Sequence, residues 1–308
     1  MIRQLKKQMV SKLPISILNK LFHLIQQLRY LKISGKYNKT KKTFDVSEQE
    51  ANQLSIANLR KLQKQYPYQA EYGYSPEILD RRGKERAEQL AGLIRDKCCI
   101  TYLELGCWDG MVSFHMLKKG KSAIGIDNRD IGFDQRAIEA GVDLRKMDAS
   151  KLDFDDDSFD VVFSYDAFEH FSDPESVLRE MTRVTKPGGY IYLEFGPLFM
   201  SPMGLHAYRE ITVPYCQHLF SEATIAAFLV EERLEALDFS HCNGWSLIQF
   251  RNLFAVYSTK LSKELYVETC NYEHLNLIEE YPSIMKNKTD YFENLMCDSI
   301  KVLFRKKK

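Results

Sequence analysis

Between residues 100 and 195 the chain alternates between short apolar runs and amphipathic segments. Strands are expected at residues 100–105, 122–126, 142–145, 161–164 and 190–195. The segments between them are long enough for helices that cross over from one strand to the next. This rhythm predicts an α/β fold, with a doubly wound, mostly parallel sheet and helices on both faces.

The residues ahead of this region predict helices. Apolar side chains recur at helical spacing from residue 14 to residue 33, with basic and polar side chains between them, as in a basic amphipathic helix. Residues 34–43 are rich in Gly, Lys, Asn and Thr and are expected to be a linker. Two further helices are predicted at 47–65 and 76–95, and the aromatic-rich loop at 66–74 could form part of a pocket lid.

Beyond the fifth strand the pattern predicts mainly helices. One helix is expected at 222–237, and a mostly helical insertion at about 246–296 precedes a final strand at 299–304. The chain is therefore expected to consist of a helical extension with its linker, residues 1–44, and one α/β domain, residues 45–308.

The charge of the chain is unevenly distributed. The 308 residues include 43 Lys and Arg and 42 Asp and Glu, a net charge of +1. Residues 1–44 hold eleven of the basic residues and no acidic one, so residues 45–308 carry 32 basic and 42 acidic residues, a net charge of −10. The basic arm suits peripheral contact with a membrane surface, docking on a partner, or packing on the chain's own body. The acidic body gives no reason to expect a nucleic-acid partner.

Composition and cysteine usage exclude several other classes. A hydrophobic content of 44% with ordinary numbers of Gly and Pro excludes collagen-like and disordered chains. The sequence contains no run of about 18 apolar residues, so a membrane-spanning helix is not expected. No secretory signal pattern is found at the N-terminus. The seven cysteines contain no Cys-x-x-Cys pair, so we expect reduced thiols in the cytoplasm. Membrane association through the basic arm is an open alternative within this expectation.

The most informative stretch runs from residue 102 to residue 113. The first strand delivers Glu104 to a loop bracketed by Gly106 and Gly110, and a helix follows. Glycines allow a tight turn and a close approach of the backbone to a ligand, and Glu104 is placed to hold a ligand's ammonium group or to order the loop. A nicotinamide or flavin dinucleotide is not expected, because its remaining glycine positions hold Trp108 and Met111.

This stretch resembles the first motif of the class I S-adenosylmethionine-dependent methyltransferases of the small-molecule type, acidic-x-Gly-x-Gly-x-Gly, with Trp108 at the middle glycine. Further blocks follow in the family's order: Asp127 after the second strand, the Asp-Ala pair at 148–149 after the third, a fourth-strand block at 159–170, and a Lys-Pro-Gly-Gly turn within 178–190. The resemblance implies S-adenosylmethionine as cofactor and a seven-stranded Rossmann-like sheet whose last strand is antiparallel.

The resemblance also implies roles for individual residues. Asp127 would bind the ribose hydroxyls, Asp148 the exocyclic amine of the adenine, and the backbone amide of Ala149 a ring nitrogen. The cofactor-binding residues implied in this way are Glu104, Gly106, Cys107, Trp108, Gly110, Asp127, Asp148, Ala149 and Tyr165.

The predicted reaction is methyl transfer to an oxygen atom of a small molecule, such as a lipid, a glycan or a secondary metabolite. A hydroxyl acceptor benefits from a general base, and histidine suits that role. The first candidate is His206, in the Met-, Phe- and Pro-rich loop at 196–208, where an apolar acceptor pocket is expected. The second is His170 after the fourth strand, and His218 is a further candidate.

Two alternatives remain open from the sequence. Asp166, Glu169 and His170 have the spacing of the metal site of RNA-terminal 2′-O-methyltransferases, with His206 or His218 as a later ligand, although no metal site is predicted here. A cofactor-binding scaffold without catalysis is the other alternative, and the substitution of Trp108 for the usual glycine is the feature that favours it.

Overall fold

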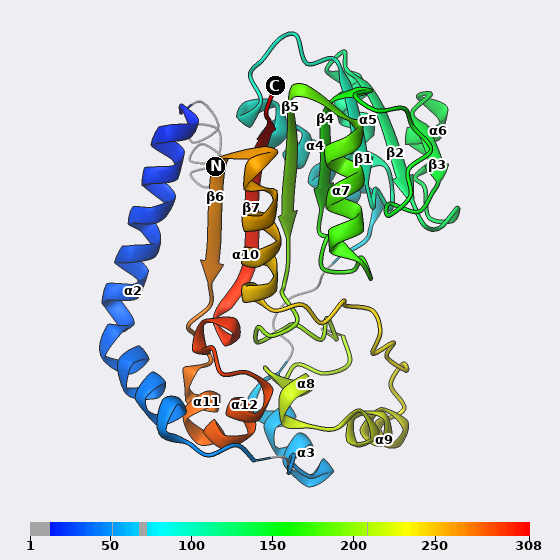
Figure 1. The fold of residues 1–308 in the computed structure, drawn as a ribbon. Coiled ribbons are helices and arrows are strands. Elements are labelled where there is room, and N and C mark those ends of the chain that lie inside the picture. The colour runs from blue at the N-terminus through cyan, green and yellow to red at the C-terminus, as the bar shows by residue number, and fades with distance from the viewer. Residues whose placement is uncertain (1–12, 51, 68–72, 208) are drawn as a thin grey trace.

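A computed structural model of the chain describes residues 13–50, 52–67, 73–207 and 209–308. It contains one seven-stranded sheet in the order β3-β2-β1-β4-β5-β7-β6 (Figure 1). The first five strands are parallel, and β7 is antiparallel to both β5 and β6, so the predicted α/β fold is confirmed. The strands are β1 Thr101–Leu105, β2 Ser122–Asp127, β3 Asp143–Lys146, β4 Phe159–Tyr165, β5 Thr185–Phe195, β6 Leu261–Cys270 and β7 Cys297–Lys306.

The central strands are buried on both faces, as expected for parallel strands between two helical layers. Leu103 of β1 and Val162 of β4 are register partners, and both pack on the face covered by α7 (Pro174–Val184) and α10 (Leu247–Val256). The alternating residues Tyr102 and Phe163 face the opposite layer, which contains α4 (Pro76–Leu93) and α5 (Met111–Lys118). The strand period of two therefore separates the two cores.

A second group of helices lies beyond the carboxyl ends of the parallel strands (Figure 1). It buries a separate hydrophobic cluster, in which Leu59, Tyr215, Phe228 and Leu277 are members. The helices of this part are α3 Ile56–Gln65, α8 Cys216–Leu219, α9 Glu222–Glu232, α11 Leu275–Glu280 and α12 Pro282–Lys288, while the short α6, Gln135–Glu139, lies between β2 and β3. This helical part and the sheet enclose the loops where ligands of open α/β folds bind.

The predicted linker at 34–43 is wrong, because α2 is one continuous helix from Ile15 to Val46. The hydroxyls of Thr40 and Thr43 donate hydrogen bonds to carbonyls one turn earlier, and Phe44 is completely buried in the second cluster. Tertiary packing at the end of the helix thus overrides the weak helix propensity of its Gly, Asn and Thr residues.

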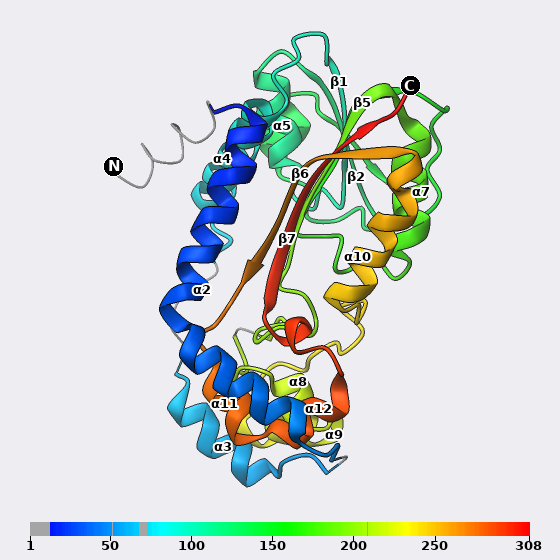
Figure 2. The ribbon, with the colours of Figure 1, turned by 60° about the vertical axis from the view of Figure 1, so that its left-hand side comes forward.

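Helix α2 docks on the chain's own body along the edge strand β6 (Figure 2). The Asn19 side chain bridges the two elements, since it donates to the Glu264 carbonyl and accepts from the Tyr266 amide. The outward side of α2 exposes a stripe of apolar side chains, Ile17, Leu24, Ile25, Leu28 and Leu31. Contact of residues 1–43 with a membrane surface or partner stays a prediction, and residues 1–12 lie outside the described residues.

The mostly helical insertion predicted at about 246–296 is wrong in part, because it contains strand β6. Leu261, Leu265 and Val267 of this strand are buried between more exposed polar residues. This period of two is a strand signal that the helical interpretation overlooked. The helix predicted at 47–65 begins only at Ile56, after the capping residue Ser55, and the one predicted at 222–237 ends at Glu232.

Two further observations concern the environment of the protein. Among the described residues, no helix has the length and apolar character that crossing a membrane would demand. All seven cysteines are free thiols in this structure.

Candidate cofactor and acceptor site

The loop after β1 is held from inside by Glu104. Its side chain is only 2% exposed, and its Oε2 accepts hydrogen bonds from the amide and the hydroxyl of Ser113, at 3.1 and 2.7 Å. Burial raises the pKa of Glu104 to about 8, because a charged carboxylate is poorly solvated there. Of the two roles expected for Glu104, ordering the loop is the one that these contacts perform.

The two bracketing glycines are required by geometry. Gly106 has φ +68°, and a Cβ atom there would lie 2.5 Å from the Cβ of Ala167. Gly110 has φ +74° and caps the N-terminus of α5, and a Cβ atom there would lie 2.8 Å from the Leu144 side chain. Both positions combine a left-handed backbone with a close approach, so side chains are excluded from them.

Trp108 occupies the middle position of the loop without filling the site. Its backbone is left-handed, with φ 42°, and its amide donates to Oδ2 of Asp127 at 3.0 Å. Trp108 is 41% exposed. The centroid of its indole lies 5.0 Å from the centroid of the Tyr74 ring and 5.4 Å from the guanidinium carbon of Arg129. Trp108 therefore replaces the glycine in backbone conformation, while its side chain points elsewhere.

Asp127 is fixed at the carboxyl end of β2. Its Oδ1 accepts from the amide and the Nε of Arg129, at 3.2 and 3.1 Å, and its Oδ2 accepts from the Trp108 amide. The residue is 7% exposed and faces a cavity. A carboxylate held by three N–H groups is preorganised for further hydrogen bonds from ligand hydroxyls.

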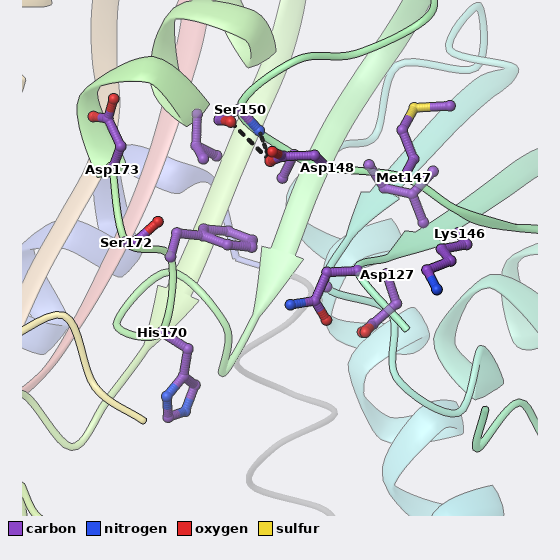
Figure 3. A pocket seen from close by; sticks show the side chains of 14 residues that line it. Asp127, Lys146, Met147, Asp148, Ser150, His170, Ser172 and Asp173 are labelled. Atoms are coloured by element: carbon purple, nitrogen blue, oxygen red, sulfur yellow. Dashed lines mark hydrogen bonds between the residues drawn. The ribbon is translucent and has the colours of Figure 1, made fainter. Parts of the chain in front are cut away.

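A cavity of about 570 Å³ opens at the carboxyl ends of β1, β2 and β4 (Figure 3). This is within the usual range of small-molecule sites. Asp148 is on its wall with Oδ1 accepting from the amide and the hydroxyl of Ser150, both at 2.8 Å (Figure 3). The lining residues are Gly106, Ile126, Asp127, Asn128, Lys146, Met147, Asp148, Ala149, Ser150, His170, Phe171, Ser172, Asp173 and Val177.

The cavity therefore brings together a subset of the predicted residues. Gly106, Asp127, Asp148, Ala149 and His170 line it. The chemistry of this wall fits S-adenosylmethionine, because two carboxylates can accept from hydroxyl and amine groups beside a turn that has no Cβ.

Other predicted residues support the cavity or lie away from it. Glu104, Cys107, Trp108 and Gly110 shape the loop behind it without lining it, and the thiol of Cys107 is buried beside Gly125.

Tyr165 faces the opposite core. Its hydroxyl donates to the Arg86 carbonyl at 3.0 Å, and burial raises its pKa well above the usual value.

His170 and His206 are neighbours although 35 residues separate them, with ring centroids 4.8 Å apart. His170 lines the cavity, whereas His206 contacts the His170 ring and is not one of the lining residues. Burial lowers the pKa of His170 to about 3, with a contribution from His206, and burial lowers the pKa of His206 to about 4. Both imidazoles are therefore neutral at physiological pH.

The third candidate, His218, lies elsewhere. It is buried in the helical part, where its Nε2 lies 3.3 Å from the Met200 carbonyl. The structure instead places His241, from the loop after α9, beside the other two, with its ring centroid 4.2 Å from that of His170. His241 was not predicted from the sequence, since no periodicity or motif marks that loop.

Asp166 and Glu169, the acidic residues of the metal site that the RNA 2′-O-methyltransferase alternative would require, are engaged in other contacts. Asp166 forms an ion pair with Arg86 on the side of α4. Oε1 of Glu169 accepts from the Gly196 amide at 3.0 Å, and its side chain is 2% exposed. These contacts do not assemble Asp166, Glu169, His170 and His218 around one point.

Comparison with known proteins agrees with this geometry. The family described as methyltransferase domain matches residues 103–193. The 27-O-demethylrifamycin SV methyltransferase of Amycolatopsis mediterranei is 32% identical over 131 residues, 40% of this chain and 48% of that protein. The ubiquinone biosynthesis O-methyltransferase of Pseudomonas paraeruginosa is 35% identical over 99 residues, 30% of this chain and 43% of that protein.

The matched region spans about half, or less, of these relatives. A solved structure from Pyrococcus horikoshii has a TM-score of 0.48 and 20% identity, and covers 80% of this chain and 99% of its own. The family match falls on β1 to β5, the strands that carry the glycine loop, Asp127 and Asp148. Residues 103–193 are therefore similar to a methyltransferase domain, the family that the sequence motifs indicate.

Proposed function

We propose that this protein transfers the methyl group of S-adenosylmethionine to an oxygen atom of a small molecule, of the lipid, glycan or secondary-metabolite type. The observation that carries the proposal is the shared cavity, in which Asp127 and Asp148 stand on the same walls as a neutral histidine, His170. Two relatives that carry names of methyltransferases, one of them an O-methyltransferase, support the choice of an oxygen acceptor.

When bound, the cofactor supplies a sulfonium methyl group, whose carbon forms a bond to the acceptor oxygen while the C–S bond breaks and its electron pair stays on sulfur. The protein's part is to hold the two reactants in line and to manage the proton of the acceptor. Asp127 and Asp148 can hold hydroxyl and amine groups of the cofactor, because each offers carboxylate oxygens at the cavity wall.

His170 is the side chain best placed to receive the acceptor's proton. Its Nδ1–H donates to the His241 carbonyl at 2.7 Å, so the unprotonated nitrogen is Nε2. This assignment revises the sequence-based preference for His206, which is not one of the residues that line the cavity. A histidine with a pKa of about 3 is a weak base, so proton transfer to it would accompany formation of the O–C bond.

The contacts of Trp108 weigh against the scaffold alternative. The indole of Trp108 does not line the cavity, and the backbone amide of Trp108 helps to fix Asp127. The substitution of the usual glycine is thus compatible with a working cofactor site.

The experiment combines cofactor binding with transfer. Calorimetry with S-adenosylmethionine should give one site, and incubation with methyl-labelled cofactor and a cell extract should label an extractable small molecule. Absence of cofactor binding would refute the proposal, and label found only in RNA would favour the RNA-methylating alternative. Binding without any labelled product would favour a scaffold.

A further inference from the structure

Three imidazoles from three distant loops meet at the edge of the cofactor cavity. His170 follows β4, His206 follows β5, and His241 follows α9. One ring nitrogen of each lies within 4.8 Å of the corresponding atoms of the other two. Of these residues, His170 also lines the cavity.

Hydrogen bonds to backbone carbonyls fix which nitrogen carries the lone pair on two of the rings. The Nδ1–H of His170 donates to the His241 carbonyl at 2.7 Å, which leaves Nε2 unprotonated. The Nε2–H of His206 donates to the Pro197 carbonyl at 2.8 Å, which leaves Nδ1 unprotonated. Metal-binding histidines usually donate their second ring N–H to a carbonyl or carboxylate in this way, because the bond orients the ring and raises its basicity.

The rings are also in the charge state that a metal needs. Burial lowers the pKa of both His170 and His206, and the proximity of His241 adds to the lowering at both rings. Metal binding requires neutral imidazole, so no proton has to be displaced from these two at physiological pH.

A buried carboxyl group lies next to the cluster and has one oxygen without a hydrogen-bond partner among the described residues. Oε1 of Glu169 lies 3.8 Å from Nε2 of His170, an atom that has no proton to donate. Its Oε2 is buried and makes no hydrogen bond with any of the described residues. A cation beside this buried side chain would offset the cost of charge on its carboxylate.

We propose that His170, His206 and His241 bind one divalent ion of the zinc class at the wall of the cofactor cavity. Three imidazole nitrogens suit zinc or cobalt, whereas magnesium and calcium prefer oxygen ligands. Glu169 supplies the compensating charge in the outer shell. This set differs from the two-acid arrangement considered from the sequence, because it uses neither Asp166 nor Glu169 as a ligand.

Formation of the site requires a small contraction. Tetrahedral zinc with Zn–N bonds of about 2.0–2.1 Å places its ligands about 3.3 Å apart, closer than the 4.8 Å limit that encloses the three nitrogens here. His241 is exposed and belongs to the loop between α9 and α10, so this loop can close on the ion while the two partly buried rings stay in place. A three-histidine set leaves the fourth position open for a ligand.

The position of the ion gives it a role that rests on the proposed function. Because His170 lines the cavity, an acceptor hydroxyl can take the fourth position, and coordination lowers the pKa of that hydroxyl. Its proton then passes to solvent water, and the oxygen is left bound to the ion as an oxyanion. The weak basicity of His170 is no obstacle in this arrangement, since the ring acts as a ligand.

The test is a titration of the full-length, chelator-treated protein with zinc by calorimetry, and with cobalt by visible absorption, in the absence of cofactor. We expect one ion per chain and the absorption of tetrahedral cobalt. His241→Ala should weaken binding at least tenfold, since even outer-shell changes at metal sites cost about 10–100-fold. The control His23→Ala changes an exposed histidine of α2 and should leave binding unchanged. Absence of a cobalt spectrum, or equal binding by wild type and His241→Ala, would overturn the proposal.

A second readout separates this proposal from the methyltransferase activity on which its role rests. Circular dichroism and cofactor calorimetry on His241→Ala should match wild type, which shows that the fold and the cofactor site are intact. Methyl transfer that continues at full rate in metal-free protein would refute the role of the ion and leave the proposed function standing. Failure of S-adenosylmethionine to bind would refute the proposed function, while the zinc titration would still decide on the site.

Discussion

The cofactor side of the cavity and the histidine cluster are built in opposite ways. Asp127 and the glycine loop follow directly from adjacent strands, and Asp127 is held by amides of Trp108 and Arg129. The histidines come from loops after β4, β5 and α9, and they meet only because the chain returns to the same place. A site made by local turns is encoded in a short motif, whereas a site made by distant loops depends on the whole fold.

The two regions also differ in how firmly they are held. The Asp127 side chain accepts three hydrogen bonds from N–H groups and is almost completely buried. In the cluster, His170 and His206 each make one carbonyl hydrogen bond, and His241 is exposed. We expect the first region to be preorganised for the cofactor, and the second to complete itself when an ion or acceptor binds.

The largest effect is expected for Asp127→Ala on cofactor affinity. The change removes hydrogen bonds to the ribose hydroxyls, and the loss of one charged hydrogen bond costs about 1.5–3 kcal/mol, so Kd should rise at least about tenfold. Calorimetry with S-adenosylmethionine measures it. Asp130→Ala, an exposed carboxylate three residues further on, is the matched control and should bind as wild type does. An unaltered Kd for Asp127→Ala would remove Asp127 from the cofactor site.

A smaller effect with a different signature is expected for His206→Ala. The ring does not line the cavity but contacts His170, so methyl transfer should slow about tenfold while the Kd of the cofactor stays within about twofold. The measurement compares kcat and the Kd of the cofactor between wild type and His206→Ala. Equal losses in both would mean that the two regions are not separable.

The pH dependence of stability should report the cluster. The folded pKa values of His170 and His206 are lowered to about 3 and about 4, below the unfolded value of about 6.5. The unfolded chain therefore takes up protons first, so the stability from these residues is complete above pH 6.5 and is lost as the pH falls toward 4.

Thermal melting in chelator at pH 7.5, 6.0 and 5.0 tests this expectation. The Tm of wild type should fall with pH, and the double variant His170→Asn/His206→Asn should show a shallower fall. His23→Asn should keep the wild-type slope. A double variant with the wild-type slope would show that these histidines titrate normally.

The smallest effect is expected for Trp108→Gly. Glycine adopts the left-handed backbone of this position without strain, and the exposed indole does not line the cavity. The cofactor Kd should stay within about threefold, because the backbone amide that binds Asp127 remains. A loss comparable to that of Asp127→Ala would show that the indole itself contacts the ligand.

The same contrast explains what the sequence could predict. The first five strands follow from local apolar patterns along the chain. The positions of Gly106, Gly110, Asp127 and Asp148 follow from local signals too, since each of these residues belongs to a turn directly after a strand. The placement of Tyr165 on the wrong face for the cavity was not predicted. It needs the strand register, which decides the face on which a side chain lies.

Other features depend on tertiary contacts that local patterns do not contain. Residues 34–43 are helical because Phe44 and its neighbours pack into the helical part, and their composition alone indicates a linker. The position of His241 depends on the long path from α9 to α10, which has no motif. Strand β6 differs, since its alternation of apolar and polar residues was present in the sequence.

The central claim is that the cavity serves methyl transfer from S-adenosylmethionine to oxygen. The most direct measurement is incubation of the purified protein with methyl-labelled cofactor and a cell extract, followed by mass spectrometry of the labelled product. We expect a small molecule that carries the label as an O-methyl group, formed by wild type and strongly reduced with Asp127→Ala. Label on nitrogen or carbon, or no labelled product from a protein that binds the cofactor, would contradict it.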